Sequence, residues 1–192
     1  QTPTVTPVKN ISPYLVEGTD TVVSRRREPL CDCPPMTYGS KPADGGNLIF
    51  TEAEKIAAEE SFPNATRFLR PFIGSEELIN GGGRWCLWLT DASPNEWRGI
   101  KFIYDQVEKV REFRLASVKQ QTREQAATPT LFGELRQPTS TYLAVPEVSS
   151  EHRNYIPIAE LPKEVVASNL LYTVPDATPY SFGVITSRMH MS

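Results

Sequence analysis

Proline recurs along nearly the whole chain and limits what it can fold into. Seventeen of the 192 residues are proline and another 11 are glycine. A proline inside a helix removes a backbone hydrogen bond and clashes with the preceding turn. The composition therefore favours strands, turns and short helices over a helical bundle. Residues 29–47, PLCDCPPMTYGSKPADGGN, predict a long shaped loop.

Two capping boxes predict where helices begin. Thr51 with Glu54, and Ser93 with Glu96, each place a hydroxyl three positions before a glutamate. We expect the first helix to end near Pro63 and the second to continue past residue 110. The buried stripe predicted for the second helix is Ile100, Ile103, Val107, Val110 and Phe113. Apolar spacing also indicates helices over 65–78 and 162–167.

The segment Arg84–Leu89 predicts the strongest strand. Its residues are apolar or aromatic on both faces, so we expect it at the centre of a sheet. Other strands are predicted at 142–145, 155–158 and 169–174. Because helices and strands do not alternate regularly, we predict a mixed α+β fold. It would have a mainly antiparallel sheet, one long helix, several short helices and long loops rich in proline and glycine.

The stretch 132–158 is dense in hydrogen-bonding side chains. Two predicted strands flank the polar loop Pro146–Asn154, and such supported loops more often form recognition surfaces than reaction centres. Arginine can pair with guanine, glutamine and asparagine with adenine, and glutamate with cytosine. The residues that would read bases in this way are Arg136, Gln137, Glu151, Arg153 and Asn154.

A second set of cations would contact DNA phosphates, which position a protein without specifying a sequence. These candidates are Lys41, Arg84, Arg111, Arg114, Lys119 and Arg123. The net charge of −3 provides no global basic field and argues mildly against nucleic acid. In the alternative interpretation, Arg136 and Glu151 form ordinary surface ion pairs.

Common catalytic and cofactor motifs are absent from the sequence. It contains no G-x-G-x-x-G fingerprint, no P-loop and no G-x-S-x-G elbow. Amino-methyltransferases have a catalytic loop of the form Asn/Asp-Pro-Pro-aromatic. The segment Cys33–Met36 has the two prolines but neither the Asn or Asp nor the aromatic residue, so we reject it as catalytic. Cys31, Cys33, Cys86 and His190 do not have metal-site spacing, and we expect no metal.

Two alternative functions stay open. His152 could act as a base for Ser149 or Ser150 in a small hydrolase or transferase, although no third group to orient it is identifiable. The chain could also be a structural adaptor.

Other features of the chain bear on its location and extent. Three cysteines without a signal peptide indicate a reducing compartment, so we expect a cytoplasmic location. No apolar run is long enough to cross a membrane. Since the chain begins at Gln1 and ends on an apolar segment, we expect it to be a piece of a longer protein.

Several short sequence segments together resemble those of a known protein family. They are KNISPYLVEG, PLCDCPPMTYGSKPADGGNL, RPFIGSEELINGGGRWCLWLTDASP, VREFRLAS, LFGELRQPTSTYLAVPEVSSEHRNYIPI and PDATPYSFGVITSRMHM. Over nearly the whole chain they resemble the MmeI-like enzymes, which are type II (IIG/IIL) restriction–modification DNA methyltransferases of bacteria. In that family one polypeptide joins a nuclease, a helical connector, an adenine-N6 methyltransferase and a target recognition domain.

The resemblance implies that residues 1–192 belong to the target recognition domain, with 1–50 as an extended, loop-rich opening segment. Its partners would be double-stranded DNA and the methyltransferase domain of the same polypeptide. S-adenosylmethionine and the catalytic residues would belong to that other domain, leaving neither in this chain. The words ELRQP and VSSE-R add Ser150 and His152 to the base-reading candidates. Ala159-Glu160 stands where the family often has Gly-Phe after YIPI.

Overall fold

The computed structural model describes residues 5–22, 24–26, 32–150 and 152–187. The chain divides into two compact units, residues 1–33 and 34–192. In the first unit, a turn is closed by a hydrogen bond of 2.8 Å from Ser12 N–H to the Val16 carbonyl. The second unit holds the helices and strands of the described chain. None of the described helices is both long and apolar enough to cross a membrane.

One sheet of the second unit has the order β1-β8-β5-β6. All its neighbouring strands are antiparallel. The strands are β1 (Thr37–Tyr38), β8 (Leu171–Pro175), β5 (Tyr142–Pro146) and β6 (Ala159–Leu161).

The other sheet has the order β2-β4-β3-β7. Its strands are β2 (Ile49–Thr51), β4 (Arg84–Leu87), β3 (Leu69–Ile73) and β7 (Val166–Ala167). The strand predicted at Arg84–Leu89 is confirmed as β4, and its central position is confirmed because it pairs with both β2 and β3. The β3–β7 pair is parallel.

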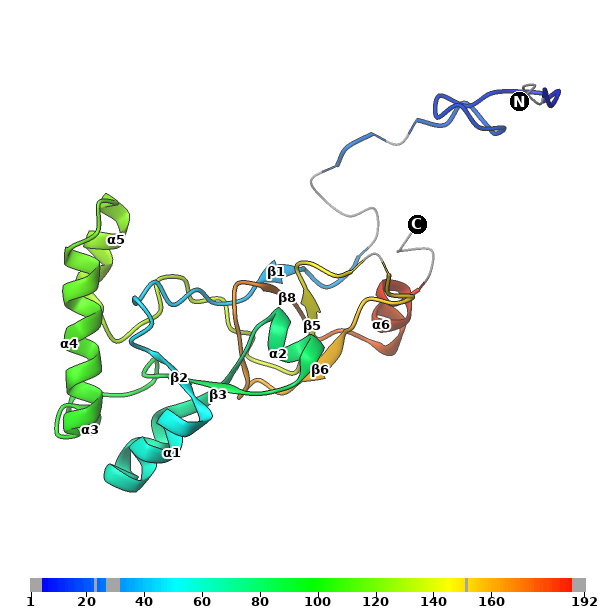
Figure 1. Ribbon diagram of the computed structural model, residues 1–192. Coiled ribbons are helices and arrows are strands. Elements are labelled where there is room, and N and C mark those ends of the chain that lie inside the picture. The colour runs from blue at the N-terminus through cyan, green and yellow to red at the C-terminus, as the bar shows by residue number, and fades with distance from the viewer. Residues whose placement is uncertain (1–4, 23, 27–31, 151, 188–192) are drawn as a thin grey trace. The chain divides into compact units, whose positions relative to one another are not determined.

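Short helices surround the sheets, and the mixed α+β prediction is confirmed. Figure 1 shows α4 and α5 at one end of the second unit and α6 beside β5 and β6 at the other. The helices are α1 (Glu52–Ser61), α2 (Ser75–Asn80), α3 (Pro94–Trp97), α4 (Lys101–Leu115), α5 (Gln120–Glu124) and α6 (Pro179–Ile185), with 3-10 turns η1 (Pro63–Phe68) and η2 (Gln125–Ala127).

Both predicted capping boxes form. The Thr51 hydroxyl accepts from Glu54 N–H at 3.3 Å, and the Glu54 carboxylate accepts from Thr51 N–H at 2.8 Å. The box at Ser93 starts only the single turn α3. The prediction of one continuous helix from Ser93 is wrong, because the chain breaks at Gly99 and Ile100 before α4 begins. Glycine has a low helix propensity, and Ile100 has an extended backbone.

The main hydrophobic core lies between the second sheet and α4. Ile103, Val107 and Val110 are fully buried there, as predicted. Phe113, also predicted to be buried, is half exposed. It instead lies against Gly45, whose positive φ no other residue adopts easily.

Strand β5 is buried on both faces. Tyr142 and Ala144 belong to one core cluster, whereas Leu143 and Val145 belong to another. This alternation is the two-residue period of a strand. The second cluster includes Ile156 and Ile158 from the segment after β5, together with Ile185 of α6.

Three predicted elements are wrong. The helix predicted over 65–78 contains β3 instead, because Pro71 favours extended backbone at Arg70 and β4 lies alongside as a partner. The strand predicted at 155–158 forms later, as β6, where Ala159 pairs with Ala144. The helix predicted over 162–167 is a turn followed by β7, which pairs with Phe72 and Ile73.

An ion pair ties α2 to β4. The Glu77 carboxylate accepts from Arg84 Nε at 2.5 Å, from Arg84 Nη2 at 3.0 Å and from Gly74 N–H at 2.7 Å. Burial alone would raise the pKa of Glu77, but these donors and the Arg84 charge outweigh it and lower the pKa below its usual 4.5.

Replacing Glu77 with glutamine should lower the free energy of unfolding by about 1–2 kcal/mol near neutral pH. Because the folded pKa of Glu77 is depressed, this stabilisation is fully present above the unfolded pKa of 4.5 and is lost as the pH falls through the folded pKa. Urea unfolding of wild type and Glu77→Gln across the acid range measures the difference. The exposed neighbour Glu76→Gln is the matched control. A wild-type advantage that does not shrink below pH 4.5 contradicts the prediction.

Candidate nucleic-acid interface

The polar loop predicted at Pro146–Asn154 begins at the last residue of β5 and lies within the connection 147–158 that leads to β6. Its exposed members include Ser150, His152, Arg153 and Asn154. The Ser150 carbonyl accepts from Arg153 N–H at 3.1 Å, and its hydroxyl accepts from His152 N–H at 3.3 Å. These bonds form a turn that presents adjacent side chains to solvent. Glu151 lies outside the described residues.

Both ends of this loop are anchored. Glu147 N–H donates to the Leu170 carbonyl at 3.0 Å, and Ile156 and Ile158 pack against β5. Between them, the hydroxyl oxygen of Ser149 is buried and has no hydrogen-bond partner among the described residues. The loop is therefore fixed at its base and open at its tip.

The second predicted reading segment runs beside the chain that follows β1. Lys41 N–H donates to the Glu134 carbonyl at 2.9 Å, and Glu134 N–H returns the bond to Lys41 at 3.0 Å. Arg136 N–H donates to the Ser40 hydroxyl at 3.0 Å. The side chains of Arg136 and Glu134 form an ion pair in which both are partly exposed.

Both reading segments attach to the short stretch 167–171, from the last residue of β7 to the first residue of β8. Ser40, which holds Arg136, donates its N–H to the Ala167 carbonyl at 2.8 Å, and the loop is held at Leu170. This connection also closes on itself, since Leu171 N–H donates to the Ser168 carbonyl at 3.0 Å. The two segments therefore share one structural support, although they are separate in sequence.

Gln137 does not point the same way as Arg136. Its amide donates to the carbonyls of Lys163 at 3.0 Å and Val165 at 2.7 Å, and its carbonyl accepts from Ala167 N–H at 3.1 Å. Tyr142 OH donates to the Val165 carbonyl at 2.7 Å, and burial raises the pKa of this phenol to about 12. Gln137 therefore holds the turn before β7, and these bonds occupy the amide that would read adenine.

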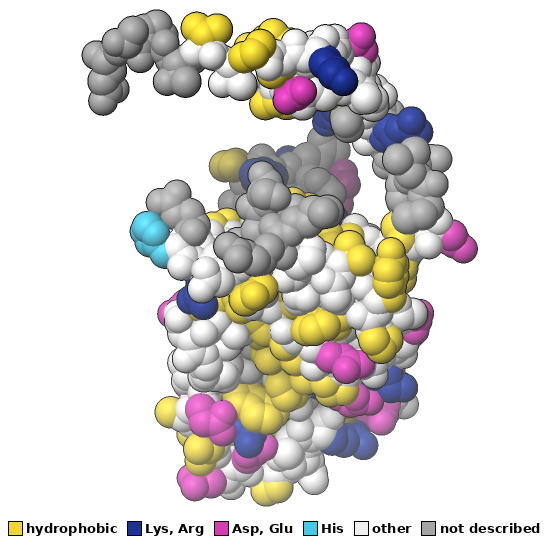
Figure 2. Space-filling model, turned by 90° about the vertical axis from the view of Figure 1, so that its right-hand side faces the viewer, with side chains coloured by type: hydrophobic (Ala, Val, Ile, Leu, Met, Phe, Trp, Pro, Cys, Tyr) yellow, Lys and Arg dark blue, Asp and Glu magenta, His cyan; other side chains and the backbone are white. Residues whose placement is uncertain are grey.

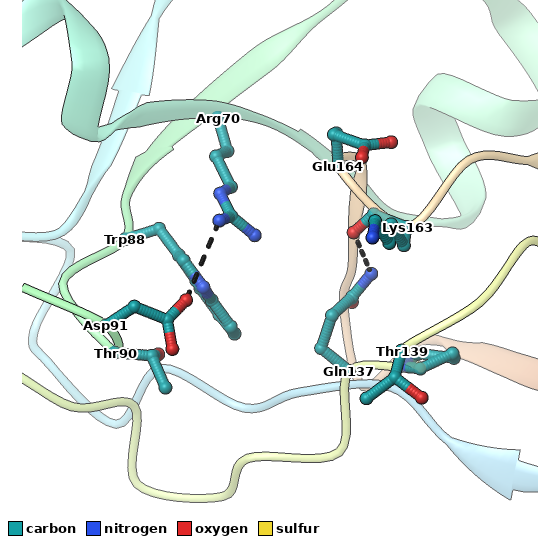
Figure 3. Close-up of a pocket in the computed structure, with 9 residues that line it drawn as sticks. Arg70, Trp88, Thr90, Asp91, Gln137, Thr139, Lys163 and Glu164 are labelled. Carbon is teal, nitrogen blue, oxygen red and sulfur yellow. Dashed lines mark hydrogen bonds and ion pairs between the residues drawn. The ribbon is translucent and has the colours of Figure 1, made fainter.

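Gln137 also borders an open pocket of about 320 Å³. Figure 3 shows the Arg70 side chain with Asp91 and Trp88 on one side, and Lys163, Glu164, Gln137 and Thr139 on the other. Arg70 Nη2 lies 3.9 Å from an Asp91 oxygen. Sequence reasoning did not single out the charged residues here, because they come from separate segments that carry no shared motif.

Three predicted phosphate contacts on α4 and α5 are exposed but differ in what their side chains contact within the domain. Arg111 is exposed and pairs with Glu108 at 3.1 Å. Lys119 is exposed at the start of α5. Arg123 is also exposed, but its Nη1 donates to the carbonyls of Ser117 at 2.8 Å and Val118 at 2.9 Å.

Two other predicted phosphate contacts are engaged inside the fold. The Arg84 guanidinium pairs with Glu77 and lies over the Phe72 ring. Arg114 is fully buried, and all its guanidinium hydrogen bonds go to backbone carbonyls. That geometry leaves Arg114 no N–H group for a DNA phosphate.

The described residues contain no cluster of three or more His, Cys, Asp or Glu side chains that could hold a metal ion. Cys86 is buried in β4, and burial raises the pKa of its thiol to about 12. Cys31 and His190, two of the side chains weighed as ligands, lie outside the described residues.

The family model for the MmeI target recognition domain matches residues 17–192. The chain belongs to this family. It is 39% identical over 185 residues to a Bacillus subtilis (strain 168) protein named DNA methyltransferase A, covering 96% of this chain and 21% of that protein. It also matches the solved structure of the type IIL restriction–modification enzyme MmeI in complex with DNA. That match has a TM-score of 0.85 and 42% identity, and covers 96% of this chain and 25% of the enzyme.

This target recognition domain thus spans about a fifth to a quarter of those relatives. The family match agrees with the resemblance carried by the sequence words. It also covers both reading segments and the shared support between β7 and β8.

The face of the domain beside α6 is chemically unlike a phosphate-binding surface. Figure 2 shows a broad band of hydrophobic side chains there, with charged groups of both signs around it. Tyr180, Phe182 and Val184 of α6 are exposed, and the helix carries no lysine or arginine.

Replacing Gln137 with methionine should lower the free energy of unfolding by about 2–3 kcal/mol, because the buried Ala167 N–H loses its acceptor. Hydrogen exchange at the Ala167 amide should also become faster. Gln121→Met on the exposed surface of α5 is the control for the change of side-chain type. If the variant and the control have the same free energy of unfolding and the same exchange rate at Ala167, Gln137 does not hold the turn before β7.

Proposed function

We propose that this domain recognises a specific base sequence in duplex DNA on behalf of a longer bacterial restriction–modification methyltransferase. The observation that carries the proposal is the match over 96% of the chain, at 42% identity, to an enzyme whose structure was solved in complex with DNA. The exposed polar loop after β5 is consistent with it, because its base is anchored and its tip is open.

In this proposal Arg136 and the loop residues Ser150, Glu151, His152, Arg153 and Asn154 read base edges. A guanidinium can donate two parallel bonds to guanine, an amide matches adenine, and a carboxylate accepts from cytosine. Arg136 would exchange its ion pair with Glu134 for a base contact. Gln137 is left out of the reading set because its amide is occupied by the turn before β7.

The exposed cations Lys41, Arg111, Lys119 and Arg123 would contact phosphates. Such contacts set the register of the protein on the duplex without reading its sequence. Arg84 and Arg114 are left out because their guanidinium groups are bound within the fold. With a net charge of −3, the domain would share the task of holding DNA with other parts of the polypeptide.

Catalysis would take place outside this domain. We propose that the rest of the polypeptide is an adenine-N6 methyltransferase that uses S-adenosylmethionine and acts on an adenine turned out of the duplex. The recognition domain would hold the DNA while that base is displaced. Because the substrate would be chromosomal DNA, this activity would take place in the bacterial cytoplasm.

Replacing Arg153 with alanine, or Glu151 with glutamine, in the complete polypeptide should change which sequence is modified. Arg153→Ala loses the donors of a base contact and Glu151→Gln loses its charge. The preference for the correct base over the others at one base pair should therefore fall by about tenfold or more. Long-read sequencing of host DNA maps the modified adenines. Tyr180→Ser, which removes an exposed ring on the apolar α6 face, is the control and should leave the modified sequence unchanged. An identical set of modified sites in both loop variants rejects their base-reading role.

Lys119→Gln should act differently from the loop variants. Losing a phosphate contact weakens binding to all sequences by the same factor and reduces the slope of log affinity against log salt concentration by about 0.9. Titration of the complete polypeptide with labelled duplexes at several salt concentrations gives that slope. Lys101→Gln at the other end of α4, where the lysine pairs with Asp105 at 2.7 Å, is the matched control. Equal slopes for wild type and Lys119→Gln argue against the phosphate contact.

A further inference from the structure

Arg114 makes an unusually complete set of contacts for an arginine. Its Nε donates to the Ala43 carbonyl at 3.0 Å. Nη1 donates to Gln125 and Thr128, both at 3.0 Å, and Nη2 donates to Pro42 at 3.0 Å and Leu131 at 2.7 Å. A guanidinium has five N–H groups, so every donor is used. Every acceptor is a backbone carbonyl.

No carboxylate of the described residues is hydrogen-bonded to this buried cation. Burial lowers the pKa of the Arg114 guanidinium below its usual value, and the nearby Asp44 carboxylate acts in the opposite direction. Asp44 itself accepts from Leu48 N–H at 2.5 Å. A lysine at this position would keep the charge, but it has only three donors and no planar fork.

The carbonyls held by Arg114 come from chain segments that are distant in sequence. Pro42 and Ala43 follow Lys41 directly, Leu131 precedes the Glu134–Arg136 segment, and Gln125 and Thr128 follow α5. The Pro42 carbonyl that accepts from Arg114 also accepts from Gly133 N–H at 2.9 Å. One side chain therefore joins the two chain segments that carry Lys41 and Arg136.

The packing at this junction leaves little freedom. A Cβ added to Gly133 would lie 2.7 Å from Ala43 Cβ and 2.9 Å from the Gln125 side-chain oxygen. The Gln125 amide donates to the Gly133 carbonyl at 2.9 Å. Since Gly133 stands three residues before Arg136, a shift at the junction would be passed directly to the reading segment.

We propose that Arg114 is a positioning residue for sequence recognition, whose guanidinium fixes the backbone of Glu134–Arg136 against that of Lys41. The inference rests on the proposed function, because it assigns Arg136 a base to read. It differs from a phosphate contact, which would alter affinity for every sequence alike. It also differs from a purely structural role, which would change stability without affecting one base pair more than the others.

The test uses Arg114→Lys in the complete polypeptide. The probes are a labelled duplex carrying the sequence that the wild type modifies in host DNA, and duplexes with one base pair changed. Binding is measured at a temperature where circular dichroism shows wild type and variant equally folded. We expect the ratio of dissociation constants, changed over unchanged duplex, to fall by about tenfold at the base pair that Arg136→Ala also affects. The ratio at the base pair affected by Arg153→Ala, and the salt slope, should stay as in wild type.

Ser40→Ala provides a milder second variant. It removes the hydroxyl that accepts from Arg136 N–H while leaving Arg114 in place, and it should reduce the same ratio in the same direction. If Arg114→Lys does not fold, Ser40→Ala decides the question by itself. Ile103→Val, which trims a fully buried side chain on the same helix, is the control for lost stability and should keep every ratio unchanged.

The outcomes separate the inference from the function on which it rests. Wild-type protein that binds all duplexes equally overturns both. Wild-type protein that discriminates, with folded Arg114→Lys discriminating as well at every base pair, overturns the positioning role alone. Where Arg114→Lys does not fold, the same result for Ser40→Ala overturns it. An affinity that falls by the same factor for every duplex in Arg114→Lys, with unchanged ratios, also overturns it.

Discussion

The buried guanidinium of Arg114 is the interaction on which the loop-rich half of this domain depends. Proline has no N–H group, so segments rich in proline cannot pair regularly with one another. Arg114 instead supplies five donors to carbonyls from three parts of the chain. The carbonyls of Pro42, Gln125 and Thr128 also accept a backbone N–H, so the guanidinium adds to local turns and joins them to one another.

The first sheet supports the other candidate reading segment in a different way. Strand β5 is buried on both faces, and the loop after it is fastened by Ile156 and Ile158 on one face and by Glu147 at the turn before β8. These contacts hold the base of the loop, whereas the described residues at its tip are exposed to solvent. Both segments are attached to the same short stretch, residues 167–171 from the end of β7 to the start of β8, which makes it the common reference for their positions.

Local sequence signals predicted local structure well. Both capping boxes form, and β4 occupies the centre of its sheet, because hydroxyl–glutamate spacing and a doubly apolar strand act within a few residues. Two of the errors fall where a distant partner decided the structure. The segment 65–78 has helical spacing, yet β3 forms there because Pro71 disfavours helix and β4 lies alongside. Segment 166–167 becomes a strand only because Phe72 and Ile73 offer an edge.

The candidate site also depends partly on local sequence and partly on tertiary contacts. The sequence by itself determined the residue types, the polar loop after β5 and the words shared with the MmeI target recognition domain family. Tertiary structure alone decided which side chains can meet a ligand. Arg114 and Arg111 are both arginines on one helix, but Arg114 follows Val110 by four residues and continues the buried stripe of α4, whereas Arg111 lies beside that stripe and is exposed. Gln137 and Arg136 are adjacent in the chain, yet the Gln137 amide is bound to carbonyls of the turn before β7, whereas the Arg136 side chain is exposed. One therefore holds the fold, while the other stays exposed.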